Sequence, residues 1–142
     1  MKAVVLKKFG GTENFEMEEI PIPSIKPGYV LIKVHASSVN PVDFKIRQGL
    51  LPIGPCLPAV LHGDLSGEIV EVGQGVTDFR KGDPVYGCVG GFSELPGVLT
   101  EFALADARLL AHKPRNLSFE EAAALPLVAI TSWNALVDRA KV

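Results

Sequence analysis

The chain has 142 residues, the length of one ordinary domain. Hydrophobic residues make up 47% of it and charged residues 21%, and the formal net charge is −2. This balance, with no long basic run, argues against nucleic acid or an acidic membrane surface as a partner.

The first half of the chain has the pattern of short strands separated by turns. The predicted strands cover residues 2–10, 15–21 and 29–40. The third is the clearest, because Val30, Ile32, Val34 and Ala36 fall on one face and Leu31 falls on the other face, with the polar residues. A short helical turn is expected over 41–49, followed by a long loop rich in Pro and Gly over 50–63.

The second half continues as strands and then changes character at Asn116. Strands are predicted over residues 65–73, 84–89, 99–106 and 108–114. Beyond them, Ser118 and Glu121 have the spacing of a helix-capping box, and Pro126 is expected to interrupt the helix that follows. Trp133 falls at helical spacing and is expected in a core. These patterns alone therefore predict a mainly β, barrel-like domain with C-terminal helices, and they do not indicate a function.

Two cysteines and the N-terminal stretch bear on location. Cys56 and Cys88 lie far apart and form no C-x-x-C pair, which argues against a zinc ribbon or finger and favours reduced thiols. A single disulfide between them stays an open alternative.

The N-terminus, MKAVVLKKFG, has four apolar residues between lysines. A secretory signal needs an apolar core of about 7–15 residues, and a membrane span needs about 20. We therefore expect a soluble cytoplasmic protein.

Four stretches of the chain together carry a resemblance: SSVNPVDFKIRQG (37–49), GDLSGEIVEVGQGVTDFRKGDPVYG (63–87), LTEFALAD (99–106) and AAALPLVAITSW (122–133). They resemble the N-terminal, GroES-like catalytic domain of the medium-chain dehydrogenase/reductase superfamily, in its zinc-free quinone oxidoreductase branch. The resemblance implies a GroES-like domain over 1–115 and a helical segment over 116–142 that leads into a nucleotide-binding domain. No G-x-G-x-x-G follows a strand, so we expect a fragment or shortened product that lacks this Rossmann domain.

The zinc-dependent members that this chain resembles carry a Cys in a V-C-x-x-D segment and a His-Glu pair in G-H-E-x-x-G. Here Asn40 stands in the Cys position, Gly63 in the His position and Asp64 in the Glu position, while His62 lies one residue too early. A catalytic zinc needs three protein ligands. We therefore expect no zinc, and we expect Gly63, Gly67 and Gly73 to serve close backbone packing.

Without a Lewis acid, the resemblance implies hydride transfer from NADPH or NADH to an activated acceptor, a quinone or an α,β-unsaturated carbonyl. The cofactor would be held mostly by the absent domain, with this chain contributing Asn40 and Thr131. Asn40, Asp43 and Lys45 are the expected catalytic residues, and the resemblance implies that Asp43 orders its loop by hydrogen bonding. The alternatives are an Asx turn for Asn40, a solvated lysine for Lys45 and a bond within the helix for Thr131. Leu51 and Phe92 are expected to line the substrate pocket.

Other readings stay open. The chain could be a relative of zinc-type alcohol dehydrogenases, a non-catalytic GroES-like co-chaperone ring subunit, or an interaction protein derived from a reductase. Fold alone does not separate these, because function resides in sites. A homo-oligomer is also left open, and apolar surface on the last helices would favour self-association.

Overall fold

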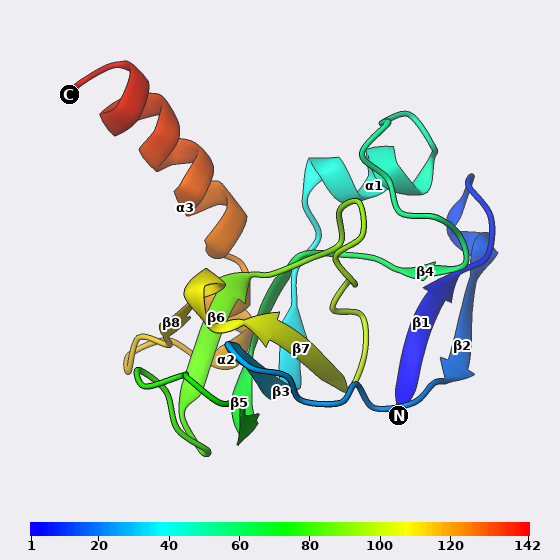
Figure 1. Cartoon of the computed structure of the whole chain (residues 1–142). Coiled ribbons are helices and arrows are strands. Elements are labelled where there is room, and N and C mark those ends of the chain that lie inside the picture. Colours follow the sequence, from blue (N-terminus) through cyan, green and yellow to red (C-terminus); the bar gives the residue numbers. More distant parts are fainter.

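The computed structural model describes residues 1–142 as two antiparallel sheets followed by helices (Figure 1). The first sheet has three strands in the order β2-β1-β4, and the second has five in the order β7-β3-β5-β6-β8. The expected mainly β fold with C-terminal helices is confirmed. The paired strands form two separate sheets rather than one closed barrel, and an isolated bridge between Ala3 and Thr100 joins them.

The N-terminal sheet forms where the sequence predicts the first two strands. β1 (Lys2–Leu6) pairs with β2 (Phe15–Glu19), and the 3₁₀ turn η1 (Thr12–Asn14) lies between them. β4 (Ala59–Val60) pairs with the end of β1, inside the segment predicted as a loop. That expectation was wrong for β4, because a two-residue strand formed by a tertiary contact leaves no periodic pattern in the sequence.

The second sheet holds the main core. Its strands are β3 (Tyr29–Ser37), β5 (Asp64–Val72), β6 (Pro84–Cys88), β7 (Phe102–Asp106) and β8 (Leu110–His112). Val30 and Ile32 of β3 are fully buried, as their alternation predicts. Leu31 is buried as well, although the alternation of β3 predicts that it lies on the polar face. The pairing of β3 with β5 shifts between Leu31 and Ile32, and this shift disturbs the strict alternation.

Glycines allow strands to approach closely. A Cβ atom at Gly67 would run into the carbonyl oxygen of Lys33 on the neighbouring strand, and one at Gly73 would run into the carbonyl oxygen of Lys26. The expectation that these glycines serve backbone packing is confirmed.

The helices divide into those that pack on the sheets and one that does not. α1 (Pro41–Arg47) follows β3, and η2 (Ala107–Leu109) connects β7 to β8. α2 (Phe119–Ala123) begins at the predicted capping box of Ser118 and Glu121. Its Phe119 ring stacks on His35 of β3 with ring centroids 4.3 Å apart.

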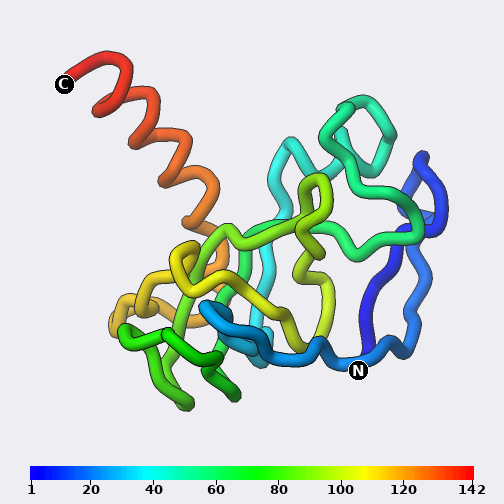
Figure 2. Tube along the Cα trace, viewed as in Figure 1, coloured from blue at the N-terminus to red at the C-terminus, as the bar shows by residue number.

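The last helical segment leaves the body of the molecule. α3 (Pro126–Trp133) begins at the proline that interrupts the helical pattern, and it continues into a π-helical stretch, η3 (Asn134–Arg139). The two form one rod that points away from both sheets, as Figures 1 and 2 show. Trp133 is therefore 63% exposed, and its expected place in a core was wrong because no element packs against this part of the rod. No helix is long and apolar enough to cross a membrane.

Candidate functional site

A buried carboxylate connects three segments that are far apart in the sequence. Asp64, the first residue of β5, is completely buried. Its Oδ2 atom accepts hydrogen bonds from Asn40 Nδ2 at 2.9 Å and from Ser38 Oγ at 3.3 Å. The backbone N–H of Leu127 donates to both carboxylate oxygens at 3.2 Å. We call Ser38, Asn40, Asp64 and Leu127 the Asp64 cluster.

The Leu127 contact follows from how α3 begins. The first N–H groups of a helix have no partner within the helix, and Pro126 at the first position has none to offer. The N–H of Leu127 therefore points out of the helix, and the Asp64 carboxylate accepts it. A buried carboxylate with three kinds of donor is well compensated for the loss of water. The arrangement fixes the start of α3 to the loop that carries Asn40.

Asn40 and Asp43, two of the expected catalytic residues, lie together at the start of α1. Asn40 is the N-cap, and the two residues form a capping box in which the Asp43 carboxylate accepts the Asn40 backbone N–H at 2.6 Å. Both side chains are buried. The expectation that Asp43 orders this loop by hydrogen bonding agrees with this contact. Asn40 is held from both sides, by Asp43 through its backbone and by Asp64 through its side chain.

Gly63 leaves no room for a ligand side chain. A Cβ atom at this position would lie 2.5 Å from the carbonyl oxygen of Gly90 and 3.1 Å from Cys88 Sγ. His62, its neighbour, has a left-handed backbone with φ of 70°, and its Nδ1 atom is buried without a hydrogen-bond partner. No group of three or more His, Cys, Asp and Glu side chains is placed to hold a metal ion. The residues present therefore do not fit a zinc site at this position.

Burial shifts the pKa values of Asp43, His62 and Cys88 in the direction that favours their neutral forms. Burial raises the pKa of Asp43, while the nearby His62 opposes that shift. Burial also lowers the pKa of His62. Cys88 lies opposite Asp64 in the pairing of β6 with β5, and burial together with the Asp64 carboxylate raises the pKa of its thiol to about 12. Cys88 is therefore a protonated thiol at neutral pH, unsuited to act as a nucleophile.

The two expected pocket residues contact one apolar cluster. Leu51 and Phe92 are both partly buried, and they pack against Leu6, Ile46 and Leu61. Phe92 also borders Gly63, since its Cε2 atom lies 3.3 Å from the Cβ position there. Leu51 and Phe92 thus pack against the same apolar cluster. Their contact with substrate stays a prediction.

The remaining two expected residues lie on exposed surfaces. Lys45 is exposed on α1. Thr131 is exposed on α3, and its Oγ1 donates to the carbonyl oxygen of Leu127 at 2.9 Å, which is the bond within the helix that was the alternative interpretation. Their roles at a cofactor or substrate stay predictions. The sequence analysis did not identify Ser38 or Leu127 as part of the site. The sequence signal for Leu127 is the proline at the first position of α3, because the next residue then has an N–H group without a partner inside the helix.

Comparisons with known proteins agree with this fold. The family model of the alcohol dehydrogenase GroES-like domain matches residues 26–115. The chain is 42% identical over 137 residues to a chloroplast envelope quinone oxidoreductase homolog of Arabidopsis thaliana, covering 92% of the chain and 40% of that protein. It is also 42% identical over 143 residues to an NADPH-dependent alkenal/one oxidoreductase of the same plant, covering 96% of the chain and 37% of that protein.

A solved structure gives the same result in three dimensions. An alcohol dehydrogenase superfamily protein from Novosphingobium aromaticivorans superposes with a TM-score of 0.95 at 45% identity, over all of this chain and 43% of that one. Fold and sequence thus define a GroES-like domain of the dehydrogenase type. The chain belongs to the alcohol dehydrogenase GroES-like domain family, within the medium-chain dehydrogenase/reductase superfamily. It spans about two fifths of the length of the relatives it matches.

Proposed function

We propose that this chain is the substrate-side domain of an NAD(P)H-dependent oxidoreductase that reduces quinones or α,β-unsaturated carbonyls without zinc. The assignment to the oxidoreductases of this superfamily is supported by the relatives described above. One of them is named a quinone oxidoreductase homolog and another an NADPH-dependent alkenal/one oxidoreductase. A cytoplasmic location stays a prediction, since the names of both relatives refer to the chloroplast.

The observation that supports zinc independence is the closed position at Gly63. Zinc-dependent relatives place a His there, but no side chain fits beside the Gly90 carbonyl oxygen in this fold. The position of the second ligand is occupied by Asn40, whose amide nitrogen is committed to Asp64. A ring of three protein ligands cannot be assembled from these residues.

The chain's own residues would position and polarise an acceptor. NAD(P)H supplies a hydride, and a quinone or enone places the resulting negative charge on its own oxygen, so the protein needs orientation and one donor. Phe92 and Leu51 would form the apolar wall beside the acceptor. Lys45 would donate to the developing enolate oxygen, and Thr131 and Asn40 would meet the nicotinamide end of the cofactor. Asp43 keeps the Asn40 loop in place.

The direct test measures NADPH oxidation by the oxidoreductase that contains this domain, with benzoquinone, with an alkenal and with a simple aldehyde, each in the presence of zinc or of a chelator. We expect consumption with the first two acceptors, no dependence on zinc, and a loss of about tenfold or more in Lys45→Ala, with Lys81→Ala as the matched control. Activity restored only by added zinc, or confined to the aldehyde, would contradict the proposal. Cofactor binding to the 142-residue chain alone is followed separately by the fluorescence of Trp133, its only tryptophan.

A further inference from the structure

The imidazole ring of His62 has a place in the structure that its own contacts do not explain. The ring is half-buried, and its Nδ1 atom lies inside the protein without a hydrogen-bond partner. The backbone has a φ of 70°, in the left-handed region that residues other than Gly rarely adopt. Both features cost stability, and costs of this kind are concentrated at functional sites.

The other two histidines have contacts within the fold. The ring of His35 stacks on that of Phe119 with centroids 4.3 Å apart. The Nε2 atom of His112 lies 3.3 Å from the carbonyl oxygen of Asp78. Neither ring has a buried nitrogen without a partner. His62 is thus the histidine whose polar atoms the fold leaves unused.

The backbone of His62 is fixed next to the predicted acceptor wall. Its carbonyl oxygen accepts the N–H of Val98 at 3.0 Å. A Cβ atom at Gly91 would lie 2.6 Å from the same carbonyl group, so the backbones of Gly91 and His62 are in close contact. Phe92 follows Gly91, and its ring also borders the space at Gly63. His62 therefore adjoins the aromatic residue that we expect beside the acceptor.

The side chain of His62 belongs to the corner that holds Asn40. The ring interacts electrostatically with the Asp43 carboxylate. No hydrogen bond joins the two, since the Asp43 carboxylate accepts the backbone N–H of Asn40 and the ring nitrogens have no partner. The ring thus lies near two of the expected catalytic residues and is bonded to neither.

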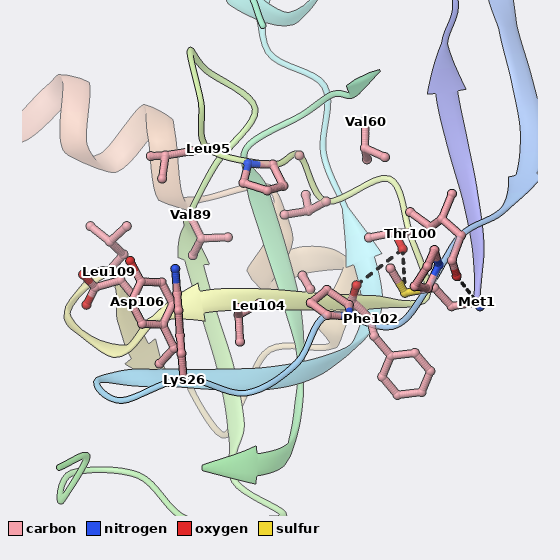
Figure 3. A pocket seen from close by; sticks show the side chains of 18 of the residues that line it. Met1, Lys26, Val60, Val89, Leu95, Thr100, Phe102, Leu104, Asp106 and Leu109 are labelled. Atoms are coloured by element: carbon pink, nitrogen blue, oxygen red, sulfur yellow. Dashed lines mark hydrogen bonds between the residues drawn. The ribbon is translucent and has the colours of Figure 1, made fainter. Parts of the chain in front are cut away.

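A separate cavity beside β7 does not include this ring. It has a volume of about 340 Å³, and Figure 3 shows it with Lys26 at one end and Met1 at the other. Val98, which donates to the His62 carbonyl oxygen, lines that cavity, but His62 does not. The backbone of His62 therefore faces the cavity side, and its ring is available to the Asn40 corner.

The buried Nδ1 atom decides where the ring carries its proton. A charged ring would bury an Nδ1–H group that has no acceptor, and burial lowers the pKa of His62. A neutral ring with its proton on Nδ1 would leave the same buried donor without a partner. The Nε2 atom has no partner in the protein either, but it is open to solvent. The favoured form is therefore a neutral imidazole with its N–H group at Nε2.

We propose that His62 is a catalytic residue whose Nε2–H group donates a hydrogen bond to the oxygen of the acceptor. This inference rests on the proposed function. The hydride from NAD(P)H forms a C–H bond on the acceptor and oxidises the cofactor, and the displaced π electrons move to the acceptor oxygen. The Nε2–H group stabilises that charge from the protein side, and Lys45 does so from the exposed side. Water supplies the proton that completes the product, so His62 stays neutral throughout.

The first test locates the proton in the 142-residue chain itself. Nitrogen NMR of the chain labelled with ¹⁵N-histidine at pH 7 distinguishes the two neutral forms of the ring from the charged form, and His62→Gly identifies the His62 signals. We expect a neutral ring with its proton on Nε2. A proton on Nδ1, or a charged ring at this pH, would overturn the proposal.

The second test uses the oxidoreductase that contains this domain. His62→Gly removes the ring and suits the left-handed backbone, so the variant should fold. We expect kcat with benzoquinone and with an alkenal to fall about tenfold or more, with little change in KM. Added imidazole should restore part of the lost rate. His112→Ala is the matched control and should keep its rate.

The outcomes separate this inference from the proposed function. No NADPH oxidation by the unsubstituted enzyme with either acceptor would overturn both. An active enzyme whose rate is unchanged in His62→Gly would overturn the role of His62 alone. A loss of rate that imidazole does not relieve, together with a loss of stability in urea, would also overturn it, because a purely structural role predicts both.

Discussion

The carboxylate of Asp64 accepts the side-chain amide of Asn40 at 2.9 Å, which ties the first residue of β5 to the first turn of α1. The same carboxylate accepts the N–H of Leu127 at the start of α3. One buried side chain thus holds together the loop, the sheet and the helix that the proposed function needs in fixed positions.

Replacing Asp64 tests this arrangement. Asp64→Ala leaves the Asn40 amide and the Leu127 N–H without their acceptor in a buried place, so we expect a loss of about 2–4 kcal/mol in the free energy of unfolding. Urea denaturation measures it, with Asp138→Ala on the exposed end of the rod as control. A loss no larger than in the control would show that the cluster contributes little to stability.

Gly63 has no space for a side chain. Gly63→Ala should destabilise the fold by about 1–3 kcal/mol, because its Cβ atom meets the Gly90 carbonyl oxygen at 2.5 Å and backbone must move. At Gly54 the nearest atom to an added Cβ lies 3.5 Å away, so Gly54→Ala is the matched control. Thermal unfolding compares the two.

The lack of space at Gly63 also predicts that substitution cannot build a zinc site at this position. The double variant Asn40→Cys with Gly63→His restores two of the three residue types of the zinc-dependent relatives, with the Asp64 carboxylate in the place of the third. It should not bind zinc stoichiometrically, because His at position 63 cannot be accommodated. Elemental analysis after dialysis measures the metal content. One tightly bound zinc per chain in a folded double variant would contradict this explanation.

His62 should make stability depend on pH. Its pKa in the folded chain lies below the ordinary value of about 6.5, so the unfolded chain takes up the proton first as the pH falls. We expect stability to decline as the pH is lowered from about 7 to 5, and His62→Asn should flatten this slope while suiting the left-handed backbone. The raised pKa of Asp43 has the opposite effect on the pH dependence of stability, and it acts toward the acidic range in which carboxyl groups titrate. The comparison of His62→Asn with the unsubstituted chain is therefore made above about pH 5.

The two thiols should differ in reactivity. With its pKa raised to about 12, Cys88 at pH 8 holds roughly a thousandfold less thiolate than an ordinary cysteine. Cys56 is exposed. A disulfide reagent at pH 8 should therefore modify one thiol quickly in the folded chain and the second only in urea. Mass spectrometry of the Cys56→Ser variant identifies the slow site, and rapid labelling there would refute the assignment.

The exposed rod should cause self-association. Val128, Ile130, Trp133 and Leu136 are all substantially exposed along it, and apolar surface of this kind favours contact between molecules. We expect the sedimentation coefficient to rise with concentration, and Trp133→Glu with Ile130→Glu to lower that dependence. A concentration-independent monomer would remove the ground for expecting a homo-oligomer.

Local sequence patterns predict the elements whose structure depends mainly on residues close together in the chain. The strand β3, the capping box of Ser118 and Glu121, and the interruption at Pro126 are all encoded within a few residues, and all appear in the fold, although Leu31 breaks the alternation of β3. β4 and the bond from Leu127 to Asp64 depend on segments more than 50 residues apart. Trp133 has helical spacing, but whether a helix face is covered depends on what packs against it. The pairing of Asn40 with Asp43 could be expected from the sequence, whereas the identity of the three groups that donate to Asp64 could not.

The bond from Leu127 to Asp64 has a mechanical consequence. The rod of α3 and η3 projects from the body, so a force applied at its far end acts on a long lever whose pivot is the first turn. That pivot is anchored directly to the carboxylate that also holds Asn40. A rotation of the rod by a few degrees would therefore reach the Asn40 loop as a displacement of its anchor, through the single residue Asp64 at the start of β5.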